Sequence, residues 1–355
     1  MRVVFVYKYL TVGGVETVLR ARLEGLPALG IDAQAWFLVD GEGRTLFHGL
    51  EARVHVGPPA QLNAYLDATP ADVVSSIDTE EILPLFEHTE RRERLIVEVH
   101  SPYLENLEYL RRLNRGRVAV FFVPSRHQGE VARKRLGAGA QIRVVPNPVR
   151  SIFCEEPEPF QPRPTRPIIA WIGRLDNLKN WRGFMEVAKR LQRRHCPVEY
   201  WIIGRAPERG VETRLYRAAR DAGVLDRLRW FNGLPHDRMP VLLDAVRDSG
   251  GLLVSTSRGE SFGMAIAEGM ARGCAVVMPA AGPFPEYVRN GENGLCYKAG
   301  SAGQAAKCAE ALLKDTQMRR RLGERAREDV LAICAPRSAL GLLTTECERA
   351  LRKGA

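Results

Sequence analysis

The chain has 355 residues, of which 45% are hydrophobic and 26% are charged, and this composition is typical of a globular protein long enough to form two domains. Its net charge is +10, but only 7% of its residues are aromatic, so the basic, aromatic-rich face of a nucleic-acid-binding protein is not indicated. Seven cysteines lie between Cys154 and Cys347 without a CxxC pair, which argues against a zinc ribbon and a disulfide framework.

The excess of basic over acidic residues lies in the second half of the chain. Residues 1–155 contain 19 Lys and Arg and 19 Asp and Glu, so the whole excess lies in residues 156–355. Part of it is the segment QMRRRLGERARED, which we interpret as the solvated face of a helix. No apolar run approaches the roughly 20 residues that span a bilayer, and the N-terminal segment predicts a strand with interspersed charge rather than a signal peptide. We therefore expect a cytoplasmic protein without nucleic acid or stable membrane attachment.

Short apolar runs alternate with amphipathic stretches, which predicts two βαβ domains with parallel sheets. In the first half we predict strands at residues 2–7, 32–39, 71–76, 94–99, 118–123 and 142–146. In the second half we predict strands at residues 167–173, 198–204, 228–233, 250–256, 274–279 and 293–297. Between the halves, EEPEPFQPRPTRP has five prolines in thirteen residues and predicts a linker. The expected organisation is a first domain at 1–155, a linker at 156–166, a second domain at 167–335 and a C-terminal helix at 336–355.

Three residues in the first half are candidates for ligand contact. Gly13 and Gly14 follow the first strand and precede an amphipathic helix; glycines let the backbone approach a ligand closely, although a plain strand-to-helix turn also uses them. His100 ends the strand at 94–99, where doubly wound sheets bind ligands, although a lone histidine there is more often structural. Ser101 and Pro102 predict the cap and first position of a following helix.

The loop after the strand at 167–173 carries two cations of different reach, Arg174 and Lys179, before a helix that opens at Asn180 or Trp181. Arginine offers a forked contact and lysine a point charge, and both suit phosphate oxygens. Taken alone, the alternative that both are surface residues of a loop is favoured.

The segment SRGESFGMAIAEGMARG places Glu260 and Glu268 around a turn that follows the strand at 250–256. We expect a helix to start near Phe262, so that the free amides of Phe262, Gly263 and Met264 lie between the two carboxylates and form an anion site. A carboxylate on each side of a phosphate site suits a nucleoside diphosphate sugar, with Glu260 at the sugar hydroxyls and Glu268 at the ribose diol. The alternative is a pair of ordinary surface glutamates.

The string ESFGMAIAE, with its glutamate pair, resembles the signature of the retaining glycosyltransferases of family four (the glycogen-synthase-like, group 1 superfamily), which have the GT-B fold. Further segments match in order over nearly the whole chain, including IIAWIGRLDNLKNWRGFMEVAKRL, VEYWIIGRAPERG and FNGLPHDRMPVLLDAV. The resemblance implies two Rossmann-like, doubly wound parallel-sheet domains facing a central cleft, with the donor mainly on the second and the acceptor mainly on the first. It also implies that the C-terminal helix at 336–355 returns to the first domain. VVPNPV departs from the family pattern, because Pro148 replaces a glycine after Asn147.

The resemblance also implies a role for each matching residue. Catalytic roles fall on His100, directed at the donor sugar, on Arg174 and Lys179 at the donor diphosphate, and on Glu260. The loop of Leu234, Pro235 and His236 would meet the nucleotide base through its backbone. Donor-binding roles fall on Gly13, Gly14, Gly204, Arg205, Leu234, Pro235, Ser261, Phe262, Gly263, Met264 and Glu268.

The expected reaction moves a hexose or N-acetylhexosamine, with retention, from a nucleoside diphosphate sugar to a hydroxyl of an acceptor sugar or glycoconjugate in bacterial glycan, glycolipid or natural-product biosynthesis. UDP is the first choice of nucleotide and GDP the second. The chain shows no Asp-x-Asp between a strand and a loop and no His/Cys cluster, so we expect neither a metal nor another cofactor. A monomer or weak dimer is expected.

Four other functions stay open. A sugar phosphorylase of the same fold would use free phosphate. A nucleotide-binding protein without transferase activity is less favoured, and so is an NAD-dependent oxidoreductase, because no G-x-G-x-x-G follows the first strand with an acidic residue some 20 positions later. A nucleic-acid binder would need the aromatic-rich basic face that the composition does not provide.

Overall fold

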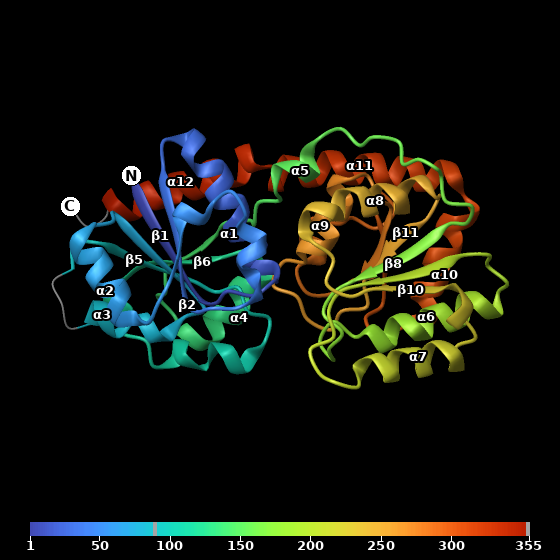
Figure 1. Ribbon diagram of the computed structural model, residues 1–355, viewed down its shortest axis with the longest axis horizontal. Coiled ribbons are helices and arrows are strands. Elements are labelled where there is room, and N and C mark those ends of the chain that lie inside the picture. The colour runs from blue at the N-terminus through green and yellow to red at the C-terminus, as the bar shows by residue number, and fades with distance from the viewer. Residues whose placement is uncertain (88–90, 353–355) are drawn as a thin grey trace. The chain divides into compact units, whose positions relative to one another are not determined.

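The computed structural model describes residues 1–87 and 91–352, and the chain folds into two compact α/β units (Figure 1). The first unit comprises Met1–Ser151 and Ile333–Ala355, and the second comprises Ile152–Ala332. Each unit is built on one parallel sheet with helices on both faces. The prediction of two Rossmann-like domains with parallel sheets is therefore confirmed.

The first sheet has seven strands in the order β3-β2-β1-β4-β5-β6-β7. Its strands are β1 (Arg2–Tyr9), β2 (Asp32–Val39), β3 (Val54–Val56), β4 (Val73–Ile77), β5 (Arg94–Glu98), β6 (Val118–Val123) and β7 (Ile142–Val144). The helices of this unit are α1 (Gly14–Gly25), α2 (Pro59–Ala68), α3 (Pro84–Glu87), α4 (Arg126–Leu136) and α12 (Pro336–Arg352).

Strand β1 shows why this sheet is covered on both faces. Val3 and Phe5 belong to the core cluster shared with α1 and α12, whereas Val4 and Val6 belong to the cluster shared with α2, α3 and α4. Alternate residues of a strand point to opposite faces, so a continuous apolar run indicates a strand that is buried on both sides. In Figure 1, α12 lies on one face of this sheet and α2 and α3 on the other.

The second sheet has six strands in the order β10-β9-β8-β11-β12-β13. Its strands are β8 (Ile168–Ile172), β9 (Glu199–Ile203), β10 (Leu228–Phe231), β11 (Leu252–Val254), β12 (Val276–Pro279) and β13 (Leu295–Tyr297). The helices of this unit are α5 (Ser151–Cys154), which begins at the unit boundary, α6 (Trp181–Arg193), α7 (Val211–Asp221), α8 (Met239–Asp248), α9 (Met264–Ala271), α10 (Ala302–Lys314) and α11 (Thr316–Cys334), which runs into the first unit. Figure 1 shows α6 and α7 on one face of the sheet and α8 and α11 on the other.

All twelve strands expected from the sequence are present, and the structure adds β3 at the edge of the first sheet. This strand has only three residues, Val54–Val56, and its middle residue is a histidine. Three residues with one polar side chain give too short an apolar pattern to predict a strand.

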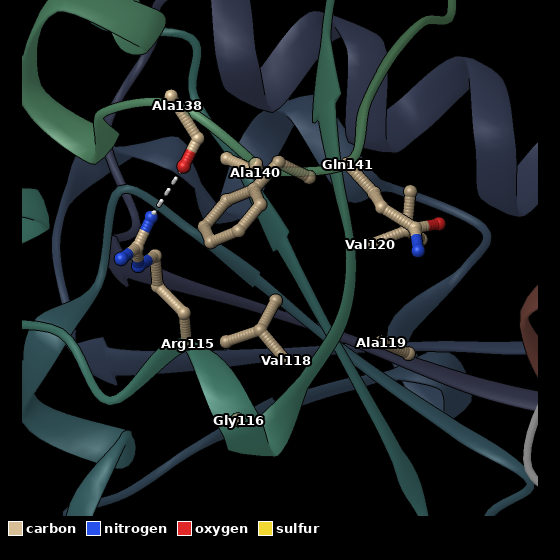
Figure 2. A pocket seen from close by; sticks show the side chains of 10 residues that line it. Arg115, Gly116, Val118, Ala119, Val120, Ala138, Ala140 and Gln141 are labelled. Carbon is tan, nitrogen blue, oxygen red and sulfur yellow. Dashed lines mark hydrogen bonds between the residues drawn. The ribbon is translucent and has the colours of Figure 1, made fainter.

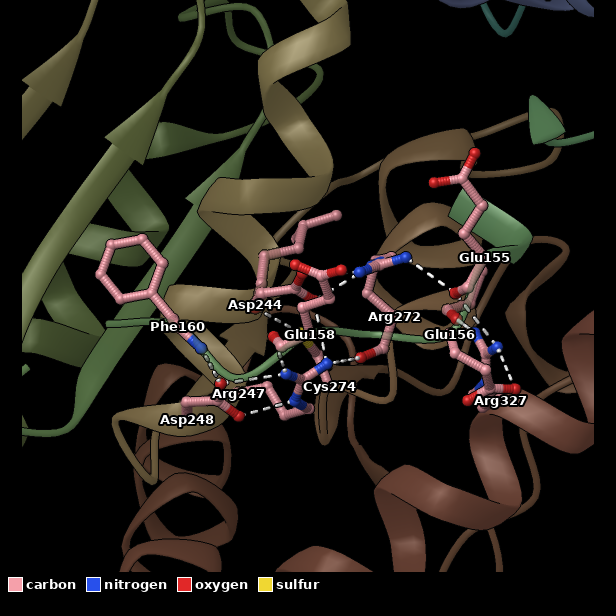
Figure 3. Close-up of polar contacts among 12 residues, drawn as sticks. Glu155, Glu156, Glu158, Phe160, Asp244, Arg247, Asp248, Arg272, Cys274 and Arg327 are labelled. Carbon is pink, nitrogen blue, oxygen red and sulfur yellow. Dashed lines mark hydrogen bonds and ion pairs between the residues drawn. The ribbon is translucent and has the colours of Figure 1, made fainter. Parts of the chain in front are cut away.

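Three arginines of the second unit hold the segment that follows α5 (Figure 3). Arg247 donates to the carbonyl of Glu158 at 3.1 Å, and Arg272 and Arg327 donate to the carbonyl of Glu155 at 2.9 and 3.2 Å. The start of the proline-rich stretch is therefore attached to the second unit by hydrogen bonds.

The stretch from Thr316 to Arg352, which contains α11 and α12, is long and apolar enough to cross a membrane by length and composition. A core helix of a water-soluble protein passes the same test. Leu340, Leu343 and Cys347 of α12 are at most 3% exposed and lie in the core cluster of the first unit. We therefore interpret this apolar face as a packing surface of the fold.

Candidate functional site

The second sheet brings four of the expected segments to one edge. Strands β10, β9, β8 and β11 are consecutive neighbours and are parallel, so the loops that follow them leave from the same edge. The carboxyl edge of a doubly wound sheet is where such domains bind ligands. The predicted residues on these loops and on α9, which we call the second-unit site, are Arg174, Lys179, Gly204, Arg205, Leu234, Pro235, His236, Glu260, Ser261, Phe262, Gly263, Met264 and Glu268.

The loops after β8 and β11 are tied together by a short hydrogen-bond network. The side chain of Asn180 donates to the carbonyl of Thr256 at 3.0 Å, and the Thr256 hydroxyl donates to the carbonyl of Asn180 at 2.8 Å. The indole of Trp171 in β8 donates to the same hydroxyl at 3.1 Å. These bonds fix the two loops side by side, and the residues that flank them, Lys179 and Glu260, meet.

Lys179 and Glu260 form a charged pair in which the lysine Nζ lies 2.7 Å from each carboxylate oxygen. The lysine side chain is 27% exposed and the glutamate side chain 12% exposed. Ser261, the next residue, is partly buried. The structure therefore brings together two predicted residues that are 81 positions apart in the chain.

Asp176 accepts hydrogen bonds from both basic residues of the loop after β8. Its Oδ2 accepts from Nε of Arg174 at 2.8 Å, and its Oδ1 accepts from the backbone N–H of Lys179 at 2.7 Å. The Arg174 side chain is 53% exposed. Sequence reasoning missed Asp176, although an aspartate three residues before the lysine is a signal for a side chain that bonds its own loop.

The turn into α9 requires a glycine at position 263. Gly263 has a φ of +94°, a left-handed value, and a Cβ placed there would lie 2.7 Å from the Phe284 ring and 2.9 Å from the Tyr287 hydroxyl. That hydroxyl donates to the carbonyl of Phe262 at 2.8 Å, and the rings of Phe262 and Tyr287 stack at 5.4 Å. The turn is thus fixed by aromatic side chains packed against its backbone.

The helix that was expected to start near Phe262 begins at Met264, two residues later, with Gly263 as its N-cap. The carbonyl of Gly263 accepts from the amides of Ile266 and Ala267 at 3.0 and 3.1 Å. Because the backbone of Gly263 has a left-handed conformation, the helix cannot extend back through this residue. Met264 therefore provides the first helical amide.

Glu268 is a buried carboxylate, so it is not an ordinary surface glutamate. Its Oε1 lies 2.9 Å from Nε2 of His236, and the two side chains are 7% and 9% exposed. Before His236 in the loop after β10, Leu234 is partly buried and Pro235 is exposed. The family resemblance assigned only the backbone of His236 to the site. The side-chain contact was missed because it joins a loop to a helix, through two residues that are 32 positions apart.

Gly204 ends β9 where two backbones approach closely. Its φ is +149°, and a Cβ there would lie 1.9 Å from the carbonyl oxygen of Gly173. The next residue, Arg205, accepts through its carbonyl from the amide of Leu175 at 3.0 Å. The ends of β8 and β9 are therefore held together through glycine backbone, next to the loop that carries the two cations.

The other three predicted residues, Gly13, Gly14 and His100, lie in the first unit. Gly13 caps α1 and Gly14 is its first residue. The buried carboxylate of Glu16 accepts from the amide of Thr11 at 3.1 Å, and a Cβ on Gly13 would come within 2.9 Å of that carboxylate. Glycine at 13 therefore leaves room for the carboxylate that closes this loop.

His100 is held by a buried charge network at the end of β5. Its Nε2 lies 2.9 Å from Oε2 of Glu98, and Arg22 of α1 donates to both oxygens of Glu98 at 2.7 and 2.8 Å. Ser75 donates to the same carboxylate at 2.6 Å. Burial on its own would raise the pKa of Glu98, but the charge of Arg22 and the hydrogen bonds from His100 and Arg22 hold this pKa well below its usual range. Glu98 thus stays ionised and fixes the imidazole.

Asp78 holds the backbone of the same histidine. Its two oxygens accept from the amide of His100 at 3.2 and 3.0 Å. Burial raises the pKa of Asp78 to about 7 and the charge of Glu98 adds to the rise, while hydrogen bonds from the amides of His100 and Ser101 oppose it. Asp78 was not among the predicted residues, and its position directly after a buried strand was the available signal.

The expected helix at Ser101 and Pro102 is wrong. The hydroxyl of Ser101 accepts from the amide of Tyr103 at 3.2 Å and from the side chain of Asn106 at 3.1 Å. The segment that follows is a 3₁₀-helix at Leu104–Arg111. Because the serine forms a local turn with the amide two residues on, it does not cap an α-helix.

A pocket of ≈ 370 Å³ in the first unit lies at the other edge of its sheet (Figure 2). It is lined by the start of β6 from Val118 and by residues 138–141, which precede β7. Arg115 at its rim donates to the carbonyls of Leu136 and Ala138 at 2.7 and 3.2 Å. This pocket is at the amino ends of the strands, whereas His100 is at a carboxyl end.

Within residues 1–87 and 91–352, no group of three or more His, Cys, Asp and Glu side chains is arranged to hold a metal ion. The seven cysteines have free thiols, and Cys196, Cys274, Cys334 and Cys347 are buried.

Comparison with known families concerns mainly the second unit. Residues 154–329 match the family model described as "Glycosyl transferases group 1". The lipopolysaccharide core biosynthesis glycosyltransferase LpsE of Rhizobium meliloti is 32% identical over 165 residues, which are 46% of this chain and 45% of that protein. The 2-deoxystreptamine N-acetyl-D-glucosaminyltransferase of Streptomyces fradiae is 28% identical over 168 residues, 47% of this chain and 38% of that protein. These matches span less than half of either relative.

Comparison with solved structures covers both units. The crystal structure of Anabaena Alr3699/HepE in complex with UDP and glucose matches with a TM-score of 0.83 and 20% sequence identity, over 98% of this chain and all of that chain. At this identity the likeness establishes the fold, and the GT-B fold that the sequence resemblance implied is confirmed.

Proposed function

Because residues 154–329 place this chain in the family of group 1 glycosyl transferases, we propose that it transfers a sugar from a nucleoside diphosphate sugar to an acceptor hydroxyl with retention of configuration. UDP is the favoured nucleotide, since a structure of the same fold contains UDP. The transferred group is a hexose or N-acetylhexosamine.

The observation that carries this proposal is the pair of Lys179 and Glu260 beside the N-terminus of α9. The ammonium group of Lys179 lies 2.7 Å from both carboxylate oxygens of Glu260. The pair therefore places a charge that can bind phosphate directly beside a group that can bind sugar hydroxyls. The helix terminus adds amide donors and a favourable dipole for an anion. This combination matches a ligand in which a diphosphate is bonded directly to a sugar.

We propose that the reaction proceeds by stabilising the departing diphosphate. The bond between the anomeric carbon and the phosphate oxygen breaks, the acceptor oxygen bonds to the same carbon on the same face, and the acceptor proton passes to the leaving phosphate. Arg174, Lys179 and the amide of Met264 would offset the negative charge that grows on the diphosphate. With this charge supplied by the chain, no metal is required in the proposal.

The other predicted residues have binding roles in this scheme. Glu260 would accept from hydroxyls of the transferred sugar and Glu268 from the ribose diol. Gly204, Arg205, Leu234 and Pro235 would surround the nucleotide base. In the first unit, we propose that His100, oriented by Glu98, contacts the transferred sugar and that Gly13 and Gly14 present backbone to the donor phosphates and acceptor.

The acceptor is a sugar or glycoconjugate in bacterial glycan, glycolipid or natural-product biosynthesis. The names of the two relatives support this range, because one acts in lipopolysaccharide core biosynthesis and the other on 2-deoxystreptamine. We place the reaction in the cytoplasm.

The test is a binding and turnover series on the full chain. Thermal unfolding is measured with UDP, GDP, inorganic phosphate and a panel of nucleotide sugars, because a ligand that binds the folded state raises its stability. We expect stabilisation by UDP or its sugars, and release of UDP with a candidate acceptor in the presence of EDTA. Stabilisation by phosphate without any effect of nucleotides would favour the sugar phosphorylase, and a strict divalent-metal requirement would contradict the charge scheme.

A further inference from the structure

His236 and Glu268 form a buried pair in the second-unit site. Nε2 of His236 lies 2.9 Å from Oε1 of Glu268, and neither side chain exceeds 9% exposure. The histidine begins the 3₁₀-helix His236–Arg238 after β10, and the glutamate lies in the middle of α9. The contact therefore joins two neighbouring parts of the site that the sequence separates.

The imidazole is itself held in place by packing. Its ring lies 5.2 Å from the ring of Phe153 at an angle of 51°, and Phe153 of α5 is fully buried. A ring packed on one side and bonded on the other keeps its hydrogen-bonding direction. His236 can therefore hold the Glu268 carboxylate in one orientation.

The pairing gives the two oxygens of Glu268 different surroundings. Oε1 accepts from His236, and the part of the chain that the structure describes provides no hydrogen bond to Oε2. A buried carboxylate is costly unless it is paired, so the histidine stabilises a charge that would otherwise be unfavourable at this position. The remaining oxygen is available to a hydroxyl of a ligand.

We propose that His236 is a positioning residue for recognition of the ribose diol, acting through Glu268. This inference rests on the proposed function, in which Glu268 accepts from the ribose. With Oε1 held by the imidazole, Oε2 is directed at the diol, so the site distinguishes a ribonucleotide from its deoxy analogues. His236 does not touch the reacting atoms, and its loss affects the selectivity of nucleotide binding.

The experiment is isothermal titration of the full chain with UDP, 2′-deoxy-UDP and 3′-deoxy-UDP. We expect the wild type to bind UDP at least about tenfold more tightly than one of the deoxy analogues, the effect of one hydrogen bond to a charged group. His236→Phe keeps a ring against Phe153 but has no donor. We expect its preference for UDP to fall to within about threefold, while its affinity for the weaker deoxy analogue stays near that of the wild type.

Four further variants separate positioning from packing. Glutamine can place an amide nitrogen where Nε2 lies, so His236→Gln restores the preference for UDP, whereas the shorter asparagine of His236→Asn does not. Glu268→Gln loses the preference, and combining it with His236→Phe produces no additional loss, because both variants break one interaction. Should His236→Phe fail to fold, the glutamine and asparagine variants provide the same comparison.

The outcomes distinguish this inference from the function on which it rests. Equal loss of affinity for UDP and both deoxy analogues in His236→Phe would show that the histidine only supports the fold, and an unchanged preference would show that it does not orient Glu268. Either result overturns the inference and leaves the proposed function intact. Failure of the wild type to bind UDP or any other nucleotide overturns both.

Discussion

Lys179 is a residue whose positive charge the proposed complex would share between a carboxylate and a diphosphate. Its ammonium group is shared between the two oxygens of Glu260, and its side chain remains 27% exposed. A diphosphate that enters the site would compete for the same charge. The pair thus fixes the ammonium group of the lysine at the turn.

Replacing this lysine is expected to impair turnover without unfolding the protein. Lys179→Ala removes a charge that the leaving diphosphate needs, so kcat/KM should fall by about 10²- to 10³-fold. The melting temperature should stay near that of the wild type, because the side chain is not in the core. Lys307→Ala, on the exposed face of α10, is the matched control. Near-normal transfer by Lys179→Ala in a steady-state assay would count against the assignment.

Asp78 makes the stability of the first unit depend on pH. Its pKa is raised to about 7 in the folded protein, chiefly by burial, and is about 4 in an unfolded chain. Between these values the folded state binds more protons than the unfolded state, so the free energy of unfolding falls as the pH rises. The contribution of the protonated Asp78 to the free energy of unfolding is fully present below about pH 4 and is lost above about pH 7.

Asp78→Asn should remove this dependence, and asparagine tolerates the positive φ of 43° at this position. The difference in unfolding free energy between variant and wild type should shift in favour of the variant by about 2 kcal/mol from pH 5 to pH 8. Chemical denaturation at the two pH values measures it. An identical pH dependence in both proteins would show that Asp78 is ionised throughout.

Sequence reasoning identified residues by their place at strand ends, and it missed the partners that hold them. His100 was found because it follows a strand, but Glu98 depends on Arg22, which is 76 residues away in the chain. The side chain of His236 was missed in the same way, because its partner Glu268 is 32 residues away. Pairing between distant segments is set by sheet order, which no local pattern reports.

At the scale of elements, the two glycines at the ends of β8 and β9 explain why these strands approach so closely. Alanine substitutions at two glycines with positive φ can separate the cost of the backbone conformation from the cost of a steric clash. Gly204 has a φ of +149° with the carbonyl of Gly173 in the way, whereas Gly291 has a φ of +80° with no heavy atom within 4 Å of a Cβ.

We expect Gly204→Ala to lower the unfolding free energy of the second unit by at least about 2 kcal/mol, because strain and a backbone clash combine. Gly291→Ala should cost about 1 kcal/mol from backbone conformation alone. Denaturant unfolding followed by tryptophan fluorescence measures both, since four of the five tryptophans lie in the second unit. Equal costs for the two variants would mean that β8 and β9 can move apart without penalty.

The positions of strands were predictable because apolar runs of five or more residues between turns are a strong signal. The starts of the helices were less predictable from the sequence. The left-handed Gly263 delays α9 to Met264, and the hydroxyl of Ser101 forms a turn where a helix cap was expected. The first difference depends on Phe284 and Tyr287, which pack against Gly263, and the second on a hydrogen bond from the amide of Tyr103.

For the whole molecule, α12 contributes to the core of the first unit although it is the last element of the chain. Leu343 is 2% exposed in that core, whereas its neighbour Leu342 is 38% exposed. The amphipathic pattern predicted a helix here, but only the family resemblance suggested where it packs. A sequence pattern gives the apolar face of a helix and not the surface that covers it.

Leu343→Ala should destabilise the first unit by about 2 to 5 kcal/mol, the usual cost of removing a buried leucine side chain. Leu342→Ala should stay within about 0.5 kcal/mol of the wild type. Hydrogen exchange read strand by strand is the suitable measurement, because we expect faster exchange in β1 and β4 of Leu343→Ala and no change in β8 and β11. Loss of protection confined to the second unit would contradict the packing of α12 described above.

The central claim is that the loops after β8 and β11 and the start of α9 bind an activated sugar through its diphosphate. A crystal structure of the full chain with UDP tests it most directly. We predict that phosphate oxygens bond to Lys179 or Arg174 and that the ribose diol lies at Glu268. A nucleotide bound in another place, or one that touches neither Lys179 nor Glu268, would contradict the account.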